Sequence, residues 1–316
     1  MINNSNSLVS IVVVTYNSSE YVLETLESAK QQTYQNIELI VTDDCSTDNT
    51  VAICSEWLGH NKERFVRTKL VESVSNTGIP ANGNRGRKNA QGVFIKGIAG
   101  DDILLPNCIE DLVDGIGDNS IITGICQPFY VDNNGEKRLR SQAPTPNNYS
   151  IFDSSSQLQH KRLLTVSFIP APAVLLRKEV WEKVGFYDER YPYMEDLPFY
   201  LKCTSEGFKI TLLPKTVVLY RTKHDSMIFR KTEFYNKKFQ NCRTQFKKEY
   251  IYSQVPWYNI VFWETELMKR TSYFIIGNIC NNRKNLLTKA IDKFFYFLSL
   301  LPYSCKIREY WYRIHK

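Results

Sequence analysis

Four short apolar runs, each followed by a stretch with helical spacing or a polar turn, constrain the fold of this 316-residue chain most strongly. The first, 8–15, reads Leu-Val-Ser-Ile-Val-Val-Val-Thr, a β-branched run typical of a strand buried on both faces. The other three runs span 37–42, 65–71 and 93–98, and we expect helices over 21–32, from a cap at Thr47 to about 58, and up to about 91. The alternation predicts an α/β fold with a mostly parallel, Rossmann-like central sheet and flanking helices.

Polar residues follow three of these runs at the point where each strand ends. They are Thr15–Asn17, Asp43-Asp44 and Asp101-Asp102. In open α/β sheets, ligands bind outside the carboxyl ends of the strands. We therefore expect the three segments to meet at one edge of the sheet and to form a binding site there.

The second half of the chain has a different pattern. We expect strands at 121–130, 173–176, 209–213 and 216–220, helices at 158–165, 178–184 and 195–206, and a polar surface loop at 132–156. Pro214 separates the last two strands. After about residue 230 the pattern is mainly helical, aromatic and basic, which predicts a main domain over 1–230 and a helical region over 231–316.

Charge and cysteine usage limit the compartment and the partners. The net charge is +7, and much of the excess lies after residue 220. Such an excess is typical of proteins that bind nucleic acid, anionic membrane surfaces or phosphorylated substrates, and also of a merely solvated basic surface. The eight cysteines form no CxxC pair and no zinc-type spacing, which indicates a reducing compartment. The first seven residues do not resemble a signal peptide, and no apolar run reaches the ~18 residues of a spanning helix.

The pair Asp101-Asp102 has two interpretations. Adjacent carboxylates after a buried strand repel each other unless a cation lies between them, and Mg²⁺ or Mn²⁺ binds such oxygens together with substrate phosphates. Alternatively, the pair opens the next helix, whose first turn would contain Pro106.

Three other polar features also have both a functional and a structural interpretation. Asp43-Asp44 could bind a nucleobase or form an Asx-turn and helix cap. Glu195-Asp196 could supply a general base or complement the dipole at a helix N-terminus. His224, in a basic segment, could bind a metal or phosphate or lie on the surface.

Taken together, these segments resemble the family 2 glycosyltransferases of GT-A fold over about residues 8–225. The resemblance rests on these segments: Ser10–Asn17, Asp43–Asp48, Asn76–Gly78 with Asn84 and Gly86, Ala99–Asp102, Gly185–Glu189, Glu195-Asp196, and Arg221 with His224. Each motif is weak alone, but their order and spacing match the family.

The resemblance implies an inverting, metal-dependent transfer from a nucleotide-sugar donor, with UDP as the usual nucleotide, Mn²⁺ or Mg²⁺ as cofactor and a β-linked product. It assigns residues 1–102 to the nucleotide-binding half and 103–230 to the acceptor-binding half. Asp196, with Glu195, would be the base, and Asp102, Asp101 and His224 would bind the metal. The implied donor contacts are Val14, Thr15, Tyr16, Asn17, Asp44, Asn84, Asp101 and Arg221.

The chain departs from the family pattern at three positions. Cys45 stands where the family has Gly, Ala99 where it often has Asp, and Gly83 where it often has Arg. We therefore expect Asp102 to be the direct metal ligand and Asp101 to contact the ribose or the metal. The charge of the diphosphate would be met by Arg85, Arg87, Lys88 or the segment 221–224.

The resemblance also implies partners. A glycan or a lipid-diphosphate-linked acceptor would receive the sugar during synthesis of a surface polysaccharide, and no nucleic acid would bind. The basic, aromatic region 231–316 would contact the cytoplasmic face of the membrane, close a helical subdomain or form a homodimer. The alternative function is a nucleotide-sugar-binding or scaffold protein with weakened catalysis. A nucleotidyltransferase or a dinucleotide-dependent dehydrogenase would need a glycine-rich phosphate loop after the first strand, and residues 16–21 contain none.

Overall fold

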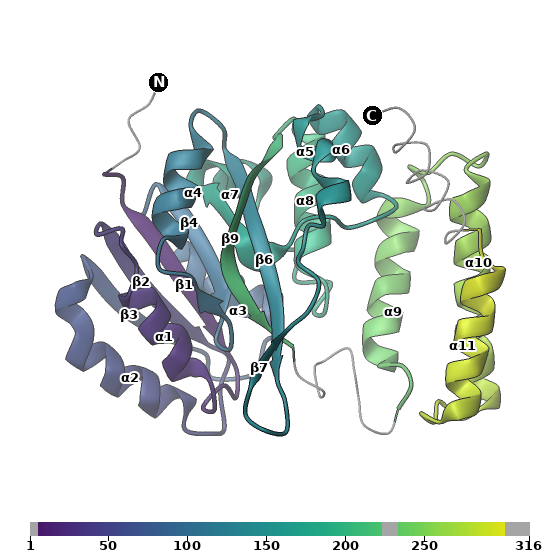
Figure 1. The fold of residues 1–316 in the computed structure, drawn as a ribbon, viewed down its shortest axis with the longest axis horizontal. Helices are drawn as coiled ribbons and strands as arrows, with labels where there is room; N and C mark the ends of the chain where they lie inside the picture. Colours follow the sequence, from purple (N-terminus) through teal and green to yellow (C-terminus); the bar gives the residue numbers. More distant parts are fainter. Residues whose placement is uncertain (1–5, 223–232, 301–316) are drawn as a thin grey trace. The chain divides into compact units, whose positions relative to one another are not determined.

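A mixed β-sheet forms the centre of the first of two compact units, Met1–Thr222 and Lys223–Lys316, into which the chain divides. The structure, a computed structural model, describes residues 6–222 and 233–300 (Figure 1). The strands are β1 (Val9–Thr15), β2 (Ile37–Asp43), β3 (Arg67–Glu72), β4 (Phe94–Ala99), β5 (Ile103–Leu104), β6 (Ile121–Val131), β7 (Lys137–Leu139), β8 (Val174–Arg177) and β9 (Ile210–Arg221).

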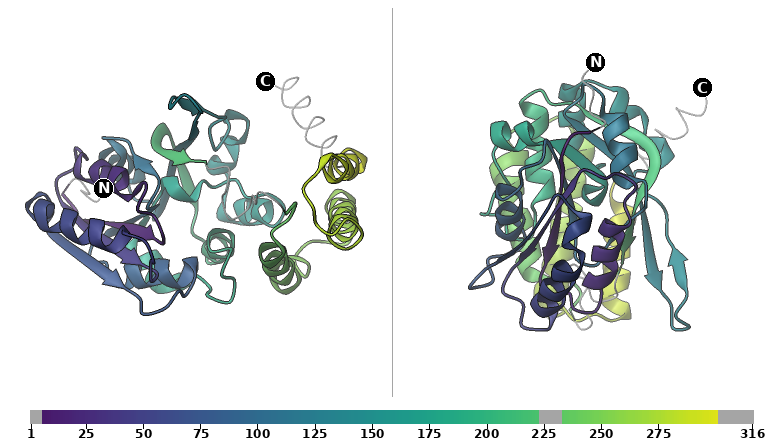
Figure 2. Two further views of the ribbon diagram at one scale, coloured as in Figure 1. Left: turned by 90° about the horizontal axis from the view of Figure 1, so that it is seen from below. Right: turned by 90° about the vertical axis from the view of Figure 1, so that its left-hand side faces the viewer.

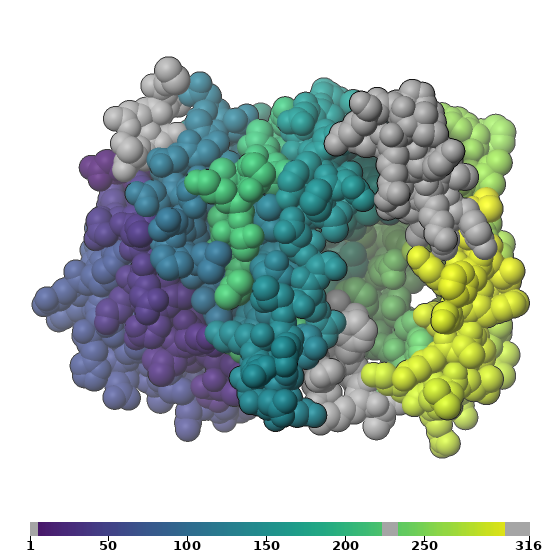
Figure 3. All heavy atoms as spheres, viewed as in Figure 1, coloured from purple at the N-terminus to yellow at the C-terminus, as the bar shows by residue number. Residues whose placement is uncertain are grey.

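The sheet order is β3-β2-β1-β4-β8-β6-β9-β5, and β7 pairs with β6. The first four strands are parallel, as the sequence predicts, whereas β8 is antiparallel to both β4 and β6. The hairpin formed by β6 and β7 lies at the lower edge of the first unit in Figures 1 and 3. The α/β class and the GT-A-like arrangement follow from this topology.

Helices cover both faces of the sheet (Figure 2). Those of the first unit are α1 (Val22–Lys30), α2 (Thr50–Asn61), α3 (Ile79–Lys88), α4 (Cys108–Ile116), α5 (Ser150–Asp153), α6 (Ser156–Leu163), α7 (Lys178–Val184) and α8 (Asp196–Ser205), with single 3₁₀ turns η1 (Lys62–Arg64), η2 (Pro146–Asn148) and η3 (Ala171–Ala173).

Alternate residues of β1 face different layers, because side chains alternate along a strand. Val9, Ile11 and Val13 pack in the main apolar core with α1, α2 and α4. Val12 faces α3, whose Gly86 allows the close approach: a Cβ there would lie 2.5 Å from Val12 Cγ1.

The register of the parallel strands brings their carboxyl ends together. Thr15 is the partner of Asp43 on β2, and Val14 is the partner of Ala99 on β4. The segments that follow these residues therefore start side by side, which is the edge predicted from the sequence.

The second unit is helical. It contains α9 (Lys237–Phe246) with the π-helical turn η4 (Lys247–Ile251), α10 (Ile260–Phe274) with the π-helical turn η5 (Ile275–Ile279), and α11 (Leu286–Leu298). The Asp292 carboxylate of α11 accepts hydrogen bonds from Tyr235 Oη at 2.6 Å and from Ser272 Oγ at 3.1 Å. Within the described ranges, none of the helices has the length and apolarity needed to cross a membrane.

Several local predictions are wrong. β9 is one strand through Pro214, because its pairing with β6 is irregular between Thr123 and Cys126, and proline is tolerated at such bulges. α2 begins at Thr50 with Asn49 as the cap, not at Thr47, since Asp48 accepts a bond from the Thr50 amide. The expected loop 132–156 contains β7, η2 and α5.

Candidate active site

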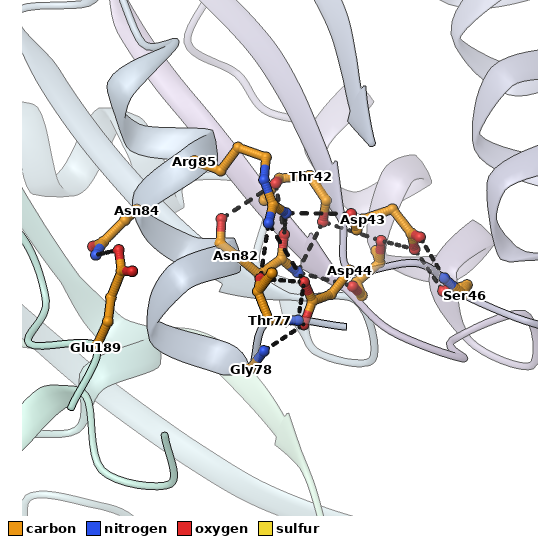
Figure 4. A network of polar contacts seen from close by, with 11 residues as sticks. Thr42, Asp43, Asp44, Ser46, Thr77, Gly78, Asn82, Asn84, Arg85 and Glu189 are labelled. Carbon is orange, nitrogen blue, oxygen red and sulfur yellow. Dashed lines mark hydrogen bonds and ion pairs between the residues drawn. The ribbon is translucent and has the colours of Figure 1, made fainter. Parts of the chain in front are cut away.

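Asp43 fixes the turn that follows β2. Its carboxylate accepts hydrogen bonds from Thr15 Oγ1 at 2.8 Å, from the Ser46 amide at 2.8 Å and from Ser46 Oγ at 2.6 Å (Figure 4). The bond from the Ser46 amide closes the turn, but Ser46 is three residues after Asp43, so it is not the Asx-turn that the sequence predicts, in which the bond comes from two residues on. The bond from Thr15 also ties the end of β1 to the end of β2.

Asp44 binds the segment that leads into α3. Its carboxylate accepts bonds from the Thr77 amide at 3.0 Å, from Thr77 Oγ1 at 2.6 Å and from the Gly78 amide at 2.7 Å, and Arg85 lies 3.5 Å away (Figure 4). Asp44 is only 2% exposed. This carboxylate therefore orders the segment 77–78 beside the sheet edge. A contact between Asp44 and a nucleobase stays a prediction.

The turn after β1 supplies the exposed groups of this region. Tyr16 is 48% exposed, and Asn17 is exposed with a positive φ of 48°. The Asn17 amide donates to Ser46 Oγ at 2.8 Å, and its Oδ1 accepts from the Thr47 amide at 2.8 Å. Thr15 is buried and Val14 half-buried, so a ligand at this edge would meet mainly Tyr16, Asn17 and the backbone.

The turn after β4 places Asp101 and Asp102 in different environments. Gly100 permits the turn, because a Cβ there would lie 2.8 Å from Thr15 Cγ2. Asp101 is half-buried, whereas Asp102 is 0% exposed. Burial, and then the charge of Asp101, raise the pKa of Asp102 to about 8. A two-residue strand, β5, follows the pair and α4 begins only at Cys108, so the pair does not open a helix.

Asp102 is buried, and its predicted role as the direct metal ligand stays a prediction. Its Oδ1 accepts a hydrogen bond from the Arg221 amide at 2.9 Å, and its Oδ2 has no partner among the described residues. The nearby charge of the fully buried Lys96 partly offsets the effect of burial on the carboxyl. Asp101 is therefore the carboxylate of the pair with access to a ligand.

Arg221 holds this turn in place. Its Nε donates to the Asp101 carbonyl at 2.9 Å, its Nη2 forms an ion pair with Glu24, and its guanidinium lies 4.2 Å from the Tyr21 ring centroid. The Arg221 side chain is 5% exposed. The predicted donor contact of Arg221 is thus not supported by its position, because its guanidinium is used within the protein. His224 lies outside the described residues.

Glu195 and Asp196 lie at the start of α8, with Glu195 as the N-cap residue. Asp196 Oδ1 accepts a hydrogen bond from the Leu197 amide at 2.7 Å, and Asp196 lies in the first turn of α8, where a negative charge complements the helix dipole. Burial, and then the charge of Asp196, raise the pKa of Glu195 to about 7. Burial also raises the pKa of Asp196. Both side chains are half-buried, and raised pKa values of this kind suit proton transfer near neutral pH.

Tyr220 of β9 is under the influence of carboxylates from two distant segments. Burial raises its pKa to about 12, and Asp102, Asp101, Cys126 and Glu195 add to this effect. The aspartate pair after β4 and Glu195 at the start of α8 thus both act on the pKa of the same tyrosine.

Asn84, a predicted donor contact, links α3 to the segment before α8 instead. Its amide group donates to the Tyr187 carbonyl at 2.9 Å and to Glu189 at 2.8 Å, and its Oδ1 accepts from the Tyr187 amide at 2.9 Å. Figure 4 shows the pair of Asn84 and Glu189 apart from the Asp44 network. Asn84 is buried, so its position indicates a structural role.

The residues present fit a divalent cation only in part. In the part of the chain that the structure describes, no three His, Cys, Asp or Glu side chains group as a metal site. Of the two carboxylates after β4, Asp101 is the accessible one, and Mg²⁺ is commonly held by one or two carboxylates plus substrate phosphates. A cation would therefore fit here when the donor supplies further oxygens.

Sequence reasoning did not identify two contributors to this region. Thr77 provides three of the bonds to Asp44, although its segment was noted only as a motif. Tyr220 lies within a strand predicted from the sequence, and no local pattern indicates that carboxylates from two distant segments act on its pKa.

A mixed sheet whose parallel strands end in polar turns at one edge, with helices on both faces, has the arrangement of a GT-A glycosyltransferase fold. Residues 10–185 match the family profile described as Glycosyl transferase family 2. That match covers more than half of the chain. The chain therefore belongs to glycosyl transferase family 2, and it is a glycosyltransferase.

Relatives and solved structures agree with this assignment. The chain is 27% identical over 236 residues to the putative glycosyltransferase EpsE of Bacillus subtilis, covering 73% of this chain and 78% of the relative. It is 28% identical to the glycosyltransferase GlyG of Streptococcus pneumoniae, over 72% of this chain and 75% of the relative.

Among solved structures, S. aureus TarS 1–349 in complex with UDP-GlcNAc is similar in fold. Its TM-score is 0.57 at 19% identity, over 90% of this chain and 78% of that chain. The same similarity covers only 43% of a longer TarS chain. The mannosyltransferase PcManGT of Pyrobaculum calidifontis, in complex with GDP-Man and Mn²⁺, matches with a TM-score of 0.52 at 15% identity, over 90% of this chain and 68% of that chain.

Proposed function

We propose that the protein is an inverting glycosyltransferase that moves a sugar from a nucleotide-sugar donor, a UDP-sugar by preference, to a hydroxyl of a glycan or lipid-linked oligosaccharide. The observation that carries this proposal is the meeting of the ends of β1, β2 and β4 at one edge of the sheet, where Asp101 is half-buried and where Asp101 and Glu195 both raise the pKa of Tyr220. A donor bound along the ends of β1, β2 and β4 would present its anomeric carbon to the carboxylates of α8. The UDP-GlcNAc complex of the similar TarS structure supports the choice of UDP.

In the proposed reaction, the acceptor oxygen forms a bond to the anomeric carbon while the bond from that carbon to the diphosphate oxygen breaks. Asp196, with Glu195 beside it, takes the proton of the acceptor hydroxyl. Because attack occurs opposite the leaving group, an α-linked donor gives a β-linked product. Asp101 would hold a divalent cation against the diphosphate, where such an ion neutralises the charge of the leaving group.

We assign the donor contacts to residues that are exposed at the edge of the sheet. Tyr16, Asn17 and the backbone of 14–17 would face the nucleotide, and Asp44 would order the Thr77-Gly78 segment beside it. Arg221 and Asn84 are left out of the donor contacts, because both are bonded within the protein.

A screen of UDP-, GDP- and dTDP-sugars tests this function. We expect one nucleotide series to raise the melting temperature of the protein, with a larger increase in the presence of Mn²⁺ or Mg²⁺, and to be hydrolysed slowly in a metal-dependent way. Asp101→Asn should lose the metal-dependent part of the stabilisation, while Asp111→Asn, on the exterior of α4, should keep it. Binding without hydrolysis or transfer to any acceptor would favour the weakened scaffold protein instead.

The second unit exposes bulky apolar side chains beside basic ones. Those that are at least half exposed on η5 and α11 are Ile279, Leu286, Leu287, Phe294, Tyr296, Phe297 and Leu298. Lys289 and Lys293 are exposed on the same helix, α11. Amphipathic basic helices of this kind bind anionic bilayers, which suits a lipid-diphosphate-linked acceptor at the cytoplasmic face of the membrane.

Vesicle sedimentation tests the membrane contact. We expect the protein to sediment with phosphatidylglycerol-containing vesicles and the double variant Phe294→Ser, Phe297→Ser to remain in the supernatant. The same loss of binding should not occur for Val66→Ser, an exposed apolar residue of the first unit. A concentration-dependent dimer that the double variant abolishes, without vesicle binding, would replace the membrane by a second copy of the chain.

A further inference from the structure

Two polar side chains of α1 hold the turn that follows β4. Thr25 Oγ1 donates to the Asp102 carbonyl at 2.8 Å, and Ser28 Oγ accepts from the Leu104 amide at 3.1 Å. Both side chains are buried, and they lie on one face of the helix, since residues three apart are neighbours there. This face of α1 therefore fixes the backbone of the turn.

Arg221 of β9 bonds the same turn. Its amide donates to Asp102 Oδ1 and its Nε donates to the Asp101 carbonyl, both at 2.9 Å. The side chain is 5% exposed, and its guanidinium lies 4.2 Å from the ring centroid of Tyr21 and 4.8 Å from that of Phe129. The bond to the Asp101 carbonyl comes from the side chain, so it is lost when the guanidinium moves.

Glu24 is the carboxylate that pairs with this buried guanidinium. Its Oε2 forms an ion pair with Arg221 Nη2, and its Oε1 forms a second pair with Lys137 of β7 at 2.9 Å. A buried charge that loses its partner is costly, so without Glu24 the guanidinium would move toward water or toward another carboxylate. Asp101 is such a carboxylate, since the guanidinium already bonds its carbonyl.

We propose that Glu24 is a positioning residue for the cation site at Asp101: through Arg221 it holds the turn after β4 in the form in which the Asp101 carboxylate binds a divalent cation together with the donor diphosphate. The inference rests on the proposed function, in which Asp101 holds that cation. Glu24 fixes the backbone of Asp101 and also satisfies the charge of Arg221, which would otherwise compete with the metal. Groups that orient a metal ligand influence metal affinity although they do not touch the metal.

The Mn²⁺ dependence of UDP binding measures this role without any need for transfer. Calorimetric titrations of the protein with UDP, in EDTA and at a series of Mn²⁺ concentrations, give the metal concentration at which the gain in affinity is half-maximal. In Glu24→Ala we expect this concentration to rise about tenfold, while the UDP affinity in EDTA stays the same. A residue that only stabilised the fold would lower the melting temperature and leave the metal concentration unchanged.

Two further variants separate the pair with Arg221 from the other contacts of Glu24. Lys137→Met is the matched control, since it removes the second partner of the same carboxylate, and it should keep the wild-type Mn²⁺ dependence. Glu24→Gln keeps an acceptor oxygen at the same length, so it should show a smaller rise than Glu24→Ala. If Glu24→Ala does not fold by circular dichroism, Glu24→Gln gives the result. An unchanged Mn²⁺ dependence in the folded Glu24 variants, or an equal rise in Lys137→Met, would overturn the proposal.

A double variant tests whether Glu24 acts through Arg221. Arg221→Lys keeps the positive charge, but an ammonium lacks the planar fork that bonds Glu24 and the Asp101 carbonyl together. We expect Arg221→Lys to raise the half-maximal Mn²⁺ concentration about as much as Glu24→Ala does. The double variant should raise it no further, because both changes remove the same interaction. Additive effects would show that Glu24 acts by another route and would contradict the proposal.

The wild-type protein separates this inference from the proposed function. If Mn²⁺ gives no gain in UDP binding to the wild-type protein, the metal-dependent part of the proposed function fails and the role of Glu24 fails with it. If the wild-type protein shows the gain and the folded Glu24 variants show the same Mn²⁺ dependence, only the role of Glu24 fails. Transfer by Glu24→Ala should return toward the wild-type rate at high Mn²⁺, because the defect lies in metal affinity, and transfer that stays low there would refute that role.

Discussion

The two sides of the candidate site satisfy their polar groups in different ways. On the strand side, every carboxylate oxygen of Asp43 and Asp44 accepts at least one hydrogen bond. On the α8 side, Glu195 and Asp196 have raised pKa values, and two nitrogen atoms of Arg87 have no partner in the described chain. The first arrangement fixes the backbone before a ligand arrives. The second allows carboxyl groups to exchange a proton near neutral pH, because burial raises their pKa.

The largest expected effect comes from the α8 side. Asp196→Asn should lower kcat on the order of 10²- to 10⁴-fold, because it removes a general base, while the donor still binds. The matched control is Glu206→Gln at the other end of α8, which should transfer at the normal rate. Donor affinity is measured by calorimetry and turnover by release of the nucleotide. Near-normal turnover in Asp196→Asn would refute the assignment of the base.

The pH dependence should show the raised pKa of the pair. The base must be ionised to accept a proton, so kcat/KM should rise with pH. Its acidic limb should lie above the ordinary carboxyl range, because burial raises the pKa of Asp196 and, to about 7, the pKa of its neighbour Glu195. Stability should change in the opposite direction. The folded chain binds protons more tightly than the unfolded chain over this window, so the contribution of Glu195 to stability falls as pH rises through it. A rate profile that is flat between pH 5 and 8, a range of about three units around this window, would contradict the assignment.

On the strand side, the main expected loss is of stability. Asp44→Ala should lower the free energy of unfolding by about 3 kcal/mol, because it removes the buried carboxylate that accepts from the Thr77 and Gly78 amides. Urea denaturation measures this change. Asp132→Ala, in the exposed loop between β6 and β7, should have a much smaller effect. Equal effects of the two variants would show that the Asp44 network does not stabilise the edge.

The smallest effect concerns Cys45, which adopts a left-handed backbone with φ of 65°. Non-glycine residues pay about 1 kcal/mol or more for this conformation. Cys45→Gly should therefore raise the free energy of unfolding. We expect a gain of about 0.5 to 1 kcal/mol, because the conformational entropy that glycine loses on folding offsets part of the relieved backbone strain. Cys45→Ala is the control, since it removes the thiol but keeps the Cβ, and it should give no gain.

The sequence predicted the parallel part of the sheet well. The runs that became β1, β2 and β4 are apolar on both faces, and a strand covered by helices on both sides requires this pattern. It also predicted that their ends carry the site, since strand ends in such sheets meet at one edge. The prediction of two strands separated by Pro214 is wrong, because only the pairing of β9 with β6 reveals the irregular region in which a proline is tolerated.

What the sequence by itself determined, then, is the family, the order of the strands' polar ends and the position of two carboxylates at the start of a helix. Which carboxylate of Asp101 and Asp102 is accessible was decided by the tertiary structure, because Arg221 of β9, far along the chain, bonds the second one from its backbone amide. The same holds for Arg87, whose place depends on glycines in a helix and a strand and on rings from α7 and the segment before α8. Burial and charge depend on neighbours that are distant in sequence, and no local pattern contains them.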